Sequence, residues 1–141
     1  MIRATAIKGS NDTSTALAEA ISGSEQDFTK RLDETAKKLR LSRSTFKNAH
    51  GLTEKGHLST AGDMAFVMKA IADDFSTYFF ILGRVNHTAA GKKITHSAER
   101  LLKEYKGAVA AKTGYTRAAG FNGVLLAEKE NERIITVVFG G

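Results

Sequence analysis

The residues best suited to do chemistry stand together late in the chain, in the run Lys112-Thr113-Gly114-Tyr115-Thr116. An ammonium and hydroxyl groups at the end of a strand can hold a carboxylate, because hydrogen bonds to charged groups are strong. A glycine among them lets a ligand lie against the backbone. These residues predict a binding site for a carboxylate, although a Lys-Thr-Gly tripeptide alone is also found in unrelated proteins.

Other short runs precede this one in a fixed order. They are Gly9-Ser10-Asn11-Asp12 between two predicted helices, His50-Gly51-Leu52, and Ser59–Ala65, and the chain ends on Val137–Gly141. Together with Lys112–Thr116, this ensemble resembles the low-molecular-mass penicillin-binding proteins, which are serine-type D-alanyl-D-alanine carboxypeptidases of peptidoglycan metabolism. The resemblance spans essentially all 141 residues.

The resemblance implies an enzyme that removes the terminal D-Ala from a peptidoglycan stem peptide through an acyl-enzyme. It also implies acylation by β-lactams, and neither a cofactor nor a metal. The substrate-binding positions of the family fall on Lys112, Thr113, Gly114 and Thr116. The catalytic positions fall on Lys112 and on Asn11, whose amide would orient the substrate.

The sequence departs from the family at the serine that relays protons, the first residue of a Ser-x-Asn signature. Gly9 stands at that position, and Ser10 occupies the middle one. Neighbouring side chains normally point in different directions. We therefore expect Ser10 to serve the helix entry rather than to replace the relay.

A second departure concerns the nucleophile, which the family carries on a Ser-x-x-Lys helix upstream of this region. Only eight residues precede Gly9. We therefore expect a chain truncated at both ends, without its nucleophile and inactive alone. The run Ser44-Thr45-Phe46-Lys47 matches the Ser-x-x-Lys pattern. It lies in a predicted extended segment, however, where side chains three residues apart point to opposite faces. We interpret it as coincidental.

Other classes of function stay open. A non-catalytic module could bind peptidoglycan peptides through Lys112, Thr113 and Asn11, or the chain could complete a partner that carries the missing N-terminal segment. Nucleic-acid binding is disfavoured, because the dense basic residues, within 37–43, suit the C-terminal turn of a helix. A metal site is also disfavoured, because the histidines lack metal-binding spacing, and turn or surface roles are expected for them: His50, His57, His87 and His96.

The elements that must position these residues begin with a mainly helical part, residues 1–82, where apolar side chains recur at helical spacing. Asp12, Ser24 and Thr60 are the predicted N-caps, the last two with an aspartate three residues on. The predicted segments are the end of a helix at 1–8, helices at 13–22, from Ser24 to Leu39 and after Thr60 with Met64, Val67, Met68 and Ile71 inward, and an aromatic segment Phe75–Phe80. Its aromatic side chains are expected to pack in the core or to cover a surface lost with the missing segment, and a partner-binding patch is the alternative.

Residues 83–141 are predicted to form two hairpins, which turn at 89–91 and 129–132. Their strands are Arg84–Thr88 with Lys92–His96, and Gly120–Glu128 with Arg133–Phe139. A strand at Ala108–Thr113 should join the second hairpin in a three-stranded antiparallel sheet, after helical turns at Ala98–Tyr105. The predicted class is α+β, and the resemblance implies part of a penicillin-binding-protein or β-lactamase-like transpeptidase fold.

Composition limits the remaining choices. The 141 residues include 21 Lys and Arg against 15 Asp and Glu, a net charge of +6, and no Cys. This length predicts one domain, and the absence of Cys excludes disulfides, Cys-ligated metals and thiol catalysis. No run reaches the ~20 apolar residues of a membrane span. The sequence as written shows no export signal, whereas the resemblance implies the periplasm or cell envelope.

Overall fold

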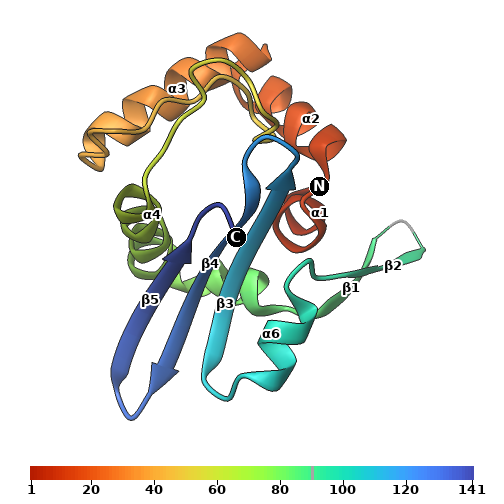
Figure 1. The fold of residues 1–141 in the computed structure, drawn as a ribbon. Helices are drawn as coiled ribbons and strands as arrows, with labels where there is room; N and C mark the ends of the chain where they lie inside the picture. The colour runs from red at the N-terminus through yellow and green to blue at the C-terminus, as the bar shows by residue number, and fades with distance from the viewer. Residues whose placement is uncertain (90) are drawn as a thin grey trace.

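Helices occupy the first part of the chain and antiparallel strands the second, as predicted (Figure 1). The computed structural model describes residues 1–89 and 91–141. Its elements are α1 (Ile2–Lys8), α2 (Asn11–Ser22), α3 (Glu25–Lys38), α4 (Ala61–Asp74), α5 (Ser76–Phe79), η1 (Phe80–Gly83), β1 (Asn86–Ala89), β2 (Lys92–Thr95), α6 (Glu99–Glu104), β3 (Ala108–Thr116), β4 (Gly120–Lys129) and β5 (Glu132–Val138). No helix of this described part is long and apolar enough to cross a membrane.

Side-chain caps start two of the helices where the sequence predicts them. The hydroxyls of Ser24 and Thr60 accept the backbone N–H groups of Asp27 and Asp63, at 3.1 Å each. The predicted cap at Asp12 is wrong. The carbonyl of Ser10 already accepts the first helical N–H bond, so Ser10 is the N-cap of α2 and Asp12 lies in the first turn, where a negative charge suits the helix dipole.

The main sheet has the order β3-β4-β5, with all pairs antiparallel. Strand β3 is longer than predicted and continues through Thr116, because Tyr115 pairs with Phe121 and Thr116 with Gly120. The β4–β5 turn lies at the predicted place but is shorter, because Lys129 pairs with Glu132. The positive φ angles of Glu130 (51°) and Asn131 (67°) fit a tight hairpin. β3 thus forms an edge of this sheet, and its Lys-Thr-Gly residues lie within regular pairing.

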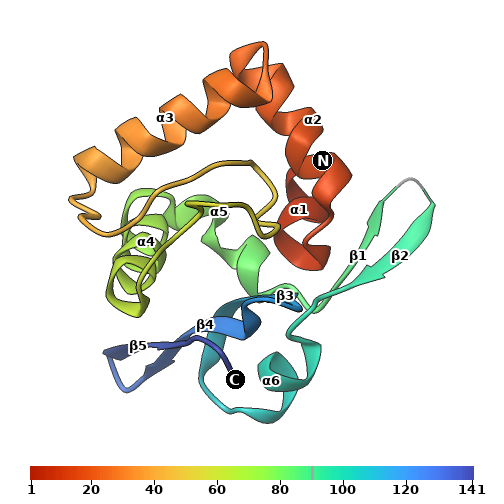
Figure 2. The ribbon, with the colours of Figure 1, turned by 45° about the horizontal axis from the view of Figure 1, so that its top comes forward.

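The core lies between α4 and one face of this sheet. Met68 and Ala72 of α4 are buried against Ala110 of β3 and Leu126 of β4. Of the other side chains predicted to face inward from α4, Met64, Val67 and Ile71 are only half-buried. Figures 1 and 2 both show α4 beside the sheet, with α2 and α3 farther from it.

The aromatic segment is only partly in the core. Phe79 packs against the core, whereas Phe75, Tyr78 and Phe80 are exposed. Four aromatic residues within six positions cannot all face inward, because this segment breaks into the short α5 and η1 rather than forming one amphipathic element.

The first hairpin pairs β1 with β2 and projects from the body of the molecule (Figure 2). Its strands are shorter than predicted. The His96 N–H still donates to the carbonyl of Val85, the residue opposite it, at 2.8 Å, but both residues lie just outside β1 and β2. Of the predicted turn Ala89-Ala90-Gly91, Ala89 instead ends β1 and pairs with Lys92, and Ala90 lies outside the described residues. Helix α6 follows within the predicted helical turns.

Candidate functional site

Lys112 is the only lysine of the described residues whose pKa is lowered by burial. Strand alternation places it on the same sheet face as Ala110, toward the helices. Its Nζ donates a hydrogen bond to the carbonyl of Thr113 at 3.1 Å. Among residues 1–89 and 91–141, no carboxylate forms an ion pair with it. The desolvation cost of this half-buried cation is therefore not offset by a neighbouring anion.

The structure brings Gly9 to this ammonium. Gly9 ends α1 in the left-handed conformation, with φ 72°. A Cβ placed on Gly9 would lie 3.0 Å from Nζ of Lys112. The two predicted regions, the Gly9-Ser10-Asn11 run and the Lys-Thr-Gly strand, therefore meet at this point, although about a hundred residues separate them in sequence.

Ser10 and Asn11 take the positions that the helix entry gives them. Ser10 is the N-cap of α2, and its carbonyl accepts from the hydroxyls of Thr13 and Ser14, at 3.0 Å each. Asn11 is the exposed first residue of α2. Its amide makes no hydrogen bond to Lys112 within the described part, so its role as a substrate-orienting group stays a prediction.

Thr113 lies on the opposite face of β3 from Lys112 and contacts Ser97, a residue that the sequence did not single out. The Thr113 hydroxyl donates to Oγ of Ser97 at 2.9 Å. The backbone N–H of Ser97 donates to the carbonyl of Ile7 at 3.0 Å. Ser97 therefore links the last turn of α1 directly to the Lys-Thr-Gly strand.

The neighbouring His96 does not have a surface role, since its side chain is buried, but it does have the expected turn role. Its Nδ1 accepts the N–H of Ala98 at 2.9 Å, so the neutral ring carries its proton on Nε2. Burial lowers the pKa of His96, and the nearby charge of Lys112 lowers it further. A neutral imidazole therefore supports the segment that holds Thr113.

Thr116 contacts Thr53, a second residue that the sequence did not single out. Its Oγ1 lies 2.7 Å from Oγ1 of Thr53, and it accepts the N–H of Ala119 at 3.2 Å. Thr53 reaches this place from the loop between α3 and α4, which passes the end of β3 in Figure 1. Buried Asn48 braces that loop, accepting the N–H of Gly51 at 2.7 Å and donating to the carbonyl of Leu52 at 3.0 Å.

Gly114 is the remaining residue of the predicted substrate-binding positions. It is exposed, and a Cβ placed on it would meet no atom within 4 Å. Because β3 is an edge strand, a ligand can approach the backbone beside Gly114. Ammonium, hydroxyl groups and open backbone thus lie along one strand, which is an arrangement suited to an extended peptide with a carboxylate.

Ser44 of the Ser-x-x-Lys run has a different role. Its hydroxyl donates to Asp63 at 2.7 Å and lies 2.8 Å from Oγ of Ser59. Asp63 also accepts the N–H of Arg43 at 3.1 Å. No hydrogen bond joins Ser44 to Lys47 in the part of the chain that the structure describes. These contacts support the interpretation that the run is coincidental, because they fasten the start of α4.

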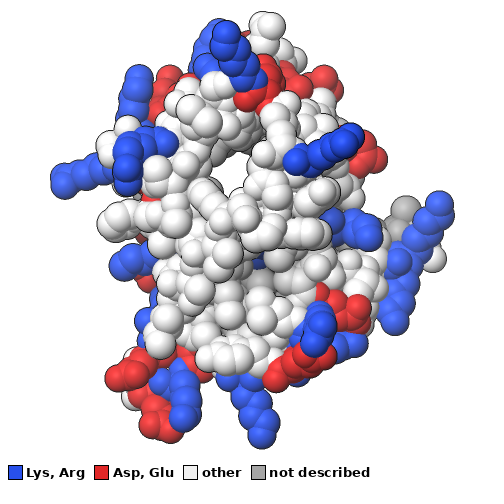
Figure 3. Space-filling model, in the orientation of Figure 1, with Lys and Arg blue, Asp and Glu red and all other residues white. Residues whose placement is uncertain are grey.

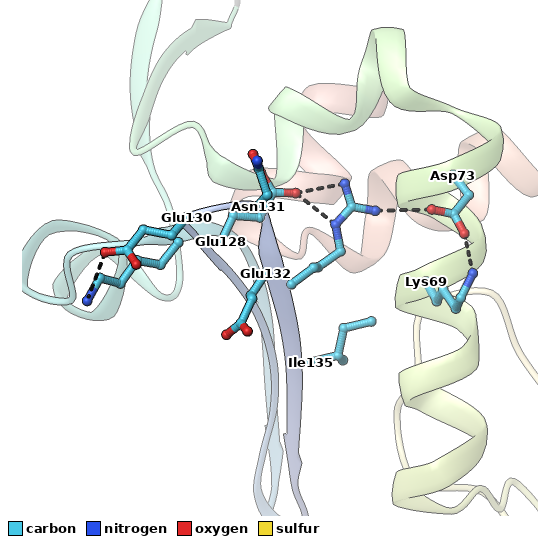
Figure 4. Close-up of a pocket in the computed structure, with 9 residues that line it drawn as sticks. Lys69, Asp73, Glu128, Glu130, Asn131, Glu132 and Ile135 are labelled. Carbon is cyan, nitrogen blue, oxygen red and sulfur yellow. Dashed lines mark hydrogen bonds and ion pairs between the residues drawn. The ribbon is translucent and has the colours of Figure 1, made fainter.

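A pocket of about 730 Å³ lies far along the sheet, at the β4–β5 turn and α4. In Figure 4, Asp73 contacts Lys69, and the carboxylate also accepts from Arg133 at 3.0 Å. Hydrogen bonding to Lys69 lowers the pKa of Asp73. Asp73 and Asp74 are the last two residues of α4. The cations in this pocket, on Lys69, Lys129 and Arg133, each pair with a carboxylate, unlike that of Lys112.

Surface charge does not form a basic face in the view of Figure 3, where Lys and Arg are scattered around the rim and the middle is largely uncharged. Within the described residues, no three His, Asp or Glu side chains lie close enough to hold a metal ion. The Lys-Thr-Gly strand and Gly9 therefore remain the best candidate site.

Known proteins are similar to this chain in sequence and in fold. The family model of the D-alanyl-D-alanine carboxypeptidases matches residues 1–141. The D-alanyl-D-alanine carboxypeptidase DacF of Bacillus subtilis is 41% identical over 99% of this chain and 37% of its own length. DacC of Escherichia coli is 34% identical over 95% of this chain and 34% of its own length.

Solved structures agree. Penicillin-binding protein 5 from Haemophilus influenzae has a TM-score of 0.88 and 31% identity, covering 98% of this chain and 40% of that one. Penicillin-binding protein D2 from Listeria monocytogenes, in its cefotaxime-bound form, has a TM-score of 0.90 and 27% identity over 99% of this chain and 57% of that one. The chain thus spans little more than a third of the curated relatives, and it belongs to the D-alanyl-D-alanine carboxypeptidase family.

Proposed function

We propose that this chain carries the carboxylate-binding part of a D-alanyl-D-alanine carboxypeptidase site and binds the D-Ala-D-Ala end of a peptidoglycan stem peptide. Lys112 supplies the cation, Thr113 and Thr116 supply hydroxyls, and Gly114 supplies open backbone. The observation that carries this proposal is the half-buried Lys112 ammonium, which has no carboxylate partner among the described residues. A ligand carboxylate would complete that arrangement.

Catalysis needs a nucleophile in addition. In the proposed reaction, a serine hydroxyl attacks the carbonyl of the penultimate D-Ala, the terminal D-Ala leaves as its amine, and water then hydrolyses the acyl-enzyme. Asn11 would orient the substrate while Lys112 holds its carboxylate. Within these 141 residues, Ser44 is engaged with Asp63, so we infer that the chain alone binds peptide and does not form an acyl-enzyme.

Intact-mass spectrometry after incubation with a reactive penicillin tests whether the chain alone can form an acyl-enzyme. We expect no added mass. A stoichiometric adduct on Ser10, Ser44 or another hydroxyl would show that a nucleophile is present and would overturn this part of the proposal. An adduct that forms only when a polypeptide with a family Ser-x-x-Lys helix is added would favour complementation of a partner chain.

Titration with an acetylated peptide ending in D-Ala-D-Ala tests binding. We expect saturable binding that is lost in Lys112→Met and in the peptide with a C-terminal amide, which lacks the carboxylate. Lys106→Met is the matched control, because Lys106 is exposed just before β3. Equal binding of acid and amide would overturn the proposal. We also propose the cell envelope as the location of this function, because peptidoglycan peptides occur there.

A further inference from the structure

The buried His96 lies directly before Ser97, at the base of the first hairpin. Its backbone is fixed on both sides, because its N–H donates to the carbonyl of Val85 at 2.8 Å and its carbonyl accepts the N–H of Glu99 at 3.1 Å. Its Nδ1 accepts the N–H of Ala98 at 2.9 Å. This last hydrogen bond spans Ser97, as an Asx turn would, and therefore fixes the backbone of Ser97.

The side chain of Ser97 contacts the Lys-Thr-Gly strand. Its Oγ accepts the hydroxyl of Thr113 at 2.9 Å, while its backbone N–H donates to the carbonyl of Ile7 at 3.0 Å. The two hydroxyls carry two protons and use one between them. Within the described residues the Ser97 hydroxyl donates to no acceptor, so it can donate to a ligand carboxylate. The direction of this donor depends on the turn that the His96 ring closes.

The ring of His96 can close this turn only while it is neutral. A neutral ring that accepts at Nδ1 carries its proton on Nε2, so Nδ1 is the nitrogen at which a second proton would bind. That proton would point at the N–H of Ala98, and two donors would then face each other. Protonation of the ring and the hydrogen bond from Ala98 therefore exclude one another.

The surroundings of the ring also disfavour a positive charge. Burial lowers the pKa of His96, and the charge of Lys112 on β3 lowers it further. The backbone carbonyls of Leu82 in η1 and Ala111 in β3 oppose both effects less strongly. Nε2 is buried without a hydrogen-bond partner among residues 1–89 and 91–141. A protonated ring is therefore more stable once it moves toward solvent, and this movement would release Ser97.

We propose that His96 is a positioning residue of the carboxylate site, because its neutral ring holds Ser97 in the orientation that presents a hydroxyl beside Thr113. This inference rests on the proposed function and deepens it, since it adds a residue and a proton dependence to the site. It makes the binding of a peptide carboxylate weaker in acid, although the carboxylate itself stays ionised above about pH 5.

Nuclear magnetic resonance tests the turn without any ligand. Long-range nitrogen-15 spectra should show that the neutral His96 ring carries its proton on Nε2. His96→Asn keeps an acceptor for the N–H of Ala98, because asparagine forms the equivalent turn, whereas His96→Leu does not. Hydrogen exchange of the Ala98 amide should be about 2–10-fold faster in His96→Leu than in His96→Asn. Equal exchange, or a ring protonated on Nδ1, would overturn the proposal.

Binding of the acetylated D-Ala-D-Ala peptide between about pH 7.5 and about pH 5 tests the positioning role. Wild-type affinity should fall about tenfold toward acid, with the same midpoint as the resonance titration of His96. His96→Asn should bind equally well at both ends of the range, because asparagine does not titrate. His96→Leu should bind about tenfold more weakly throughout. Flat wild-type binding, or an acid loss that persists in His96→Asn, would overturn the proposal.

Two further variants separate the position of the residue from its type. His87→Asn, in β1 of the projecting hairpin, should keep the wild-type pH profile. Ser97→Ala retains the ring but removes the hydroxyl, so it should bind about tenfold more weakly at neutral pH, and it replaces His96→Leu if that variant does not fold. Unchanged binding by Ser97→Ala would overturn the proposal. If the wild type binds no peptide at any pH, the proposed function fails, while exchange at Ala98 still decides whether His96 holds the turn.

Discussion

At the residue scale, Lys112 should make stability depend on pH. Burial lowers the pKa of its ammonium below the ordinary value of 10.5. Between the folded and the unfolded pKa, the unfolded chain binds more protons at this residue, so its contribution to the free energy of unfolding rises with pH. Denaturation across alkaline pH should show a smaller rise in Lys112→Met than in the wild type. Lys106→Met should retain the full rise, and an equal rise in both variants would contradict the assignment.

The hydroxyl of Thr53 should support ligand binding through Thr116. Thr53→Val keeps the shape but removes the partner that lies 2.7 Å from the Thr116 hydroxyl. We expect affinity for the D-Ala-D-Ala peptide to fall about 2–10-fold, which is the range of one neutral hydrogen bond. Thr53→Ser, which keeps a hydroxyl, should bind nearly as the wild type does. Tighter binding by Thr53→Val would mean that Thr53 competes with the ligand.

The sequence predicts part of this site and misses the rest for a physical reason. Lys112 and Gly9 stand out through motif order, and the structure places them together. Thr53 and Ser97 belong to two of the commonest polar residue types and act through partners 63 and 16 residues away. Nothing in their local sequence encodes those contacts, because the tertiary fold alone creates them.

At the element scale, Asp63 should stabilise α4 by joining it to the preceding loop. Its buried carboxylate accepts from the N–H of Arg43 and the hydroxyl of Ser44. Asp63→Ala leaves both donors without this acceptor, so we expect the free energy of unfolding to fall by about 1–3 kcal/mol. Thermal and chemical denaturation measure the loss. Asp74→Ala, at the exposed end of α4, is the control, and equal effects would contradict this role.

Local signals predict elements well and their ends less well. Ser24 and Thr60 cap α3 and α4 as predicted, because capping depends on residues within one turn. The predicted Asp12 cap fails because α2 begins earlier, with the Ser10 carbonyl accepting the N–H of Ser14, although the Ser10 side chain makes no capping hydrogen bond. Strand β3 extends beyond its predicted end because the pairing of Tyr115 with Phe121 depends on a second strand.

At the scale of the whole molecule, the sheet face opposite the core exposes apolar side chains. Ile134 is 62% exposed, whereas the next residue, Ile135, packs against the core. Exposed apolar surface next to sheet edges favours association. We expect Ile134→Thr to reduce self-association, measured by sedimentation, with little change in unfolding.

Ile135→Thr is the matched control on the other face of the same strand. It should lower the free energy of unfolding by about 1–3 kcal/mol, since it places a hydroxyl against the core. Equal effects of the two substitutions on unfolding would contradict this division of the sheet into a packed and an exposed face.

The link through Ser97 also has a consequence for the order of folding. Ser97 joins Ile7 to Thr113, and Gly9 meets Lys112, so the site closes only when the two ends of the sequence are brought together. Closing so long a loop costs conformational entropy before the contacts that it brings together can stabilise the fold. During synthesis, α2 and α3 can therefore form well before the ribosome has released β3, and binding competence should appear only after β3 has been made.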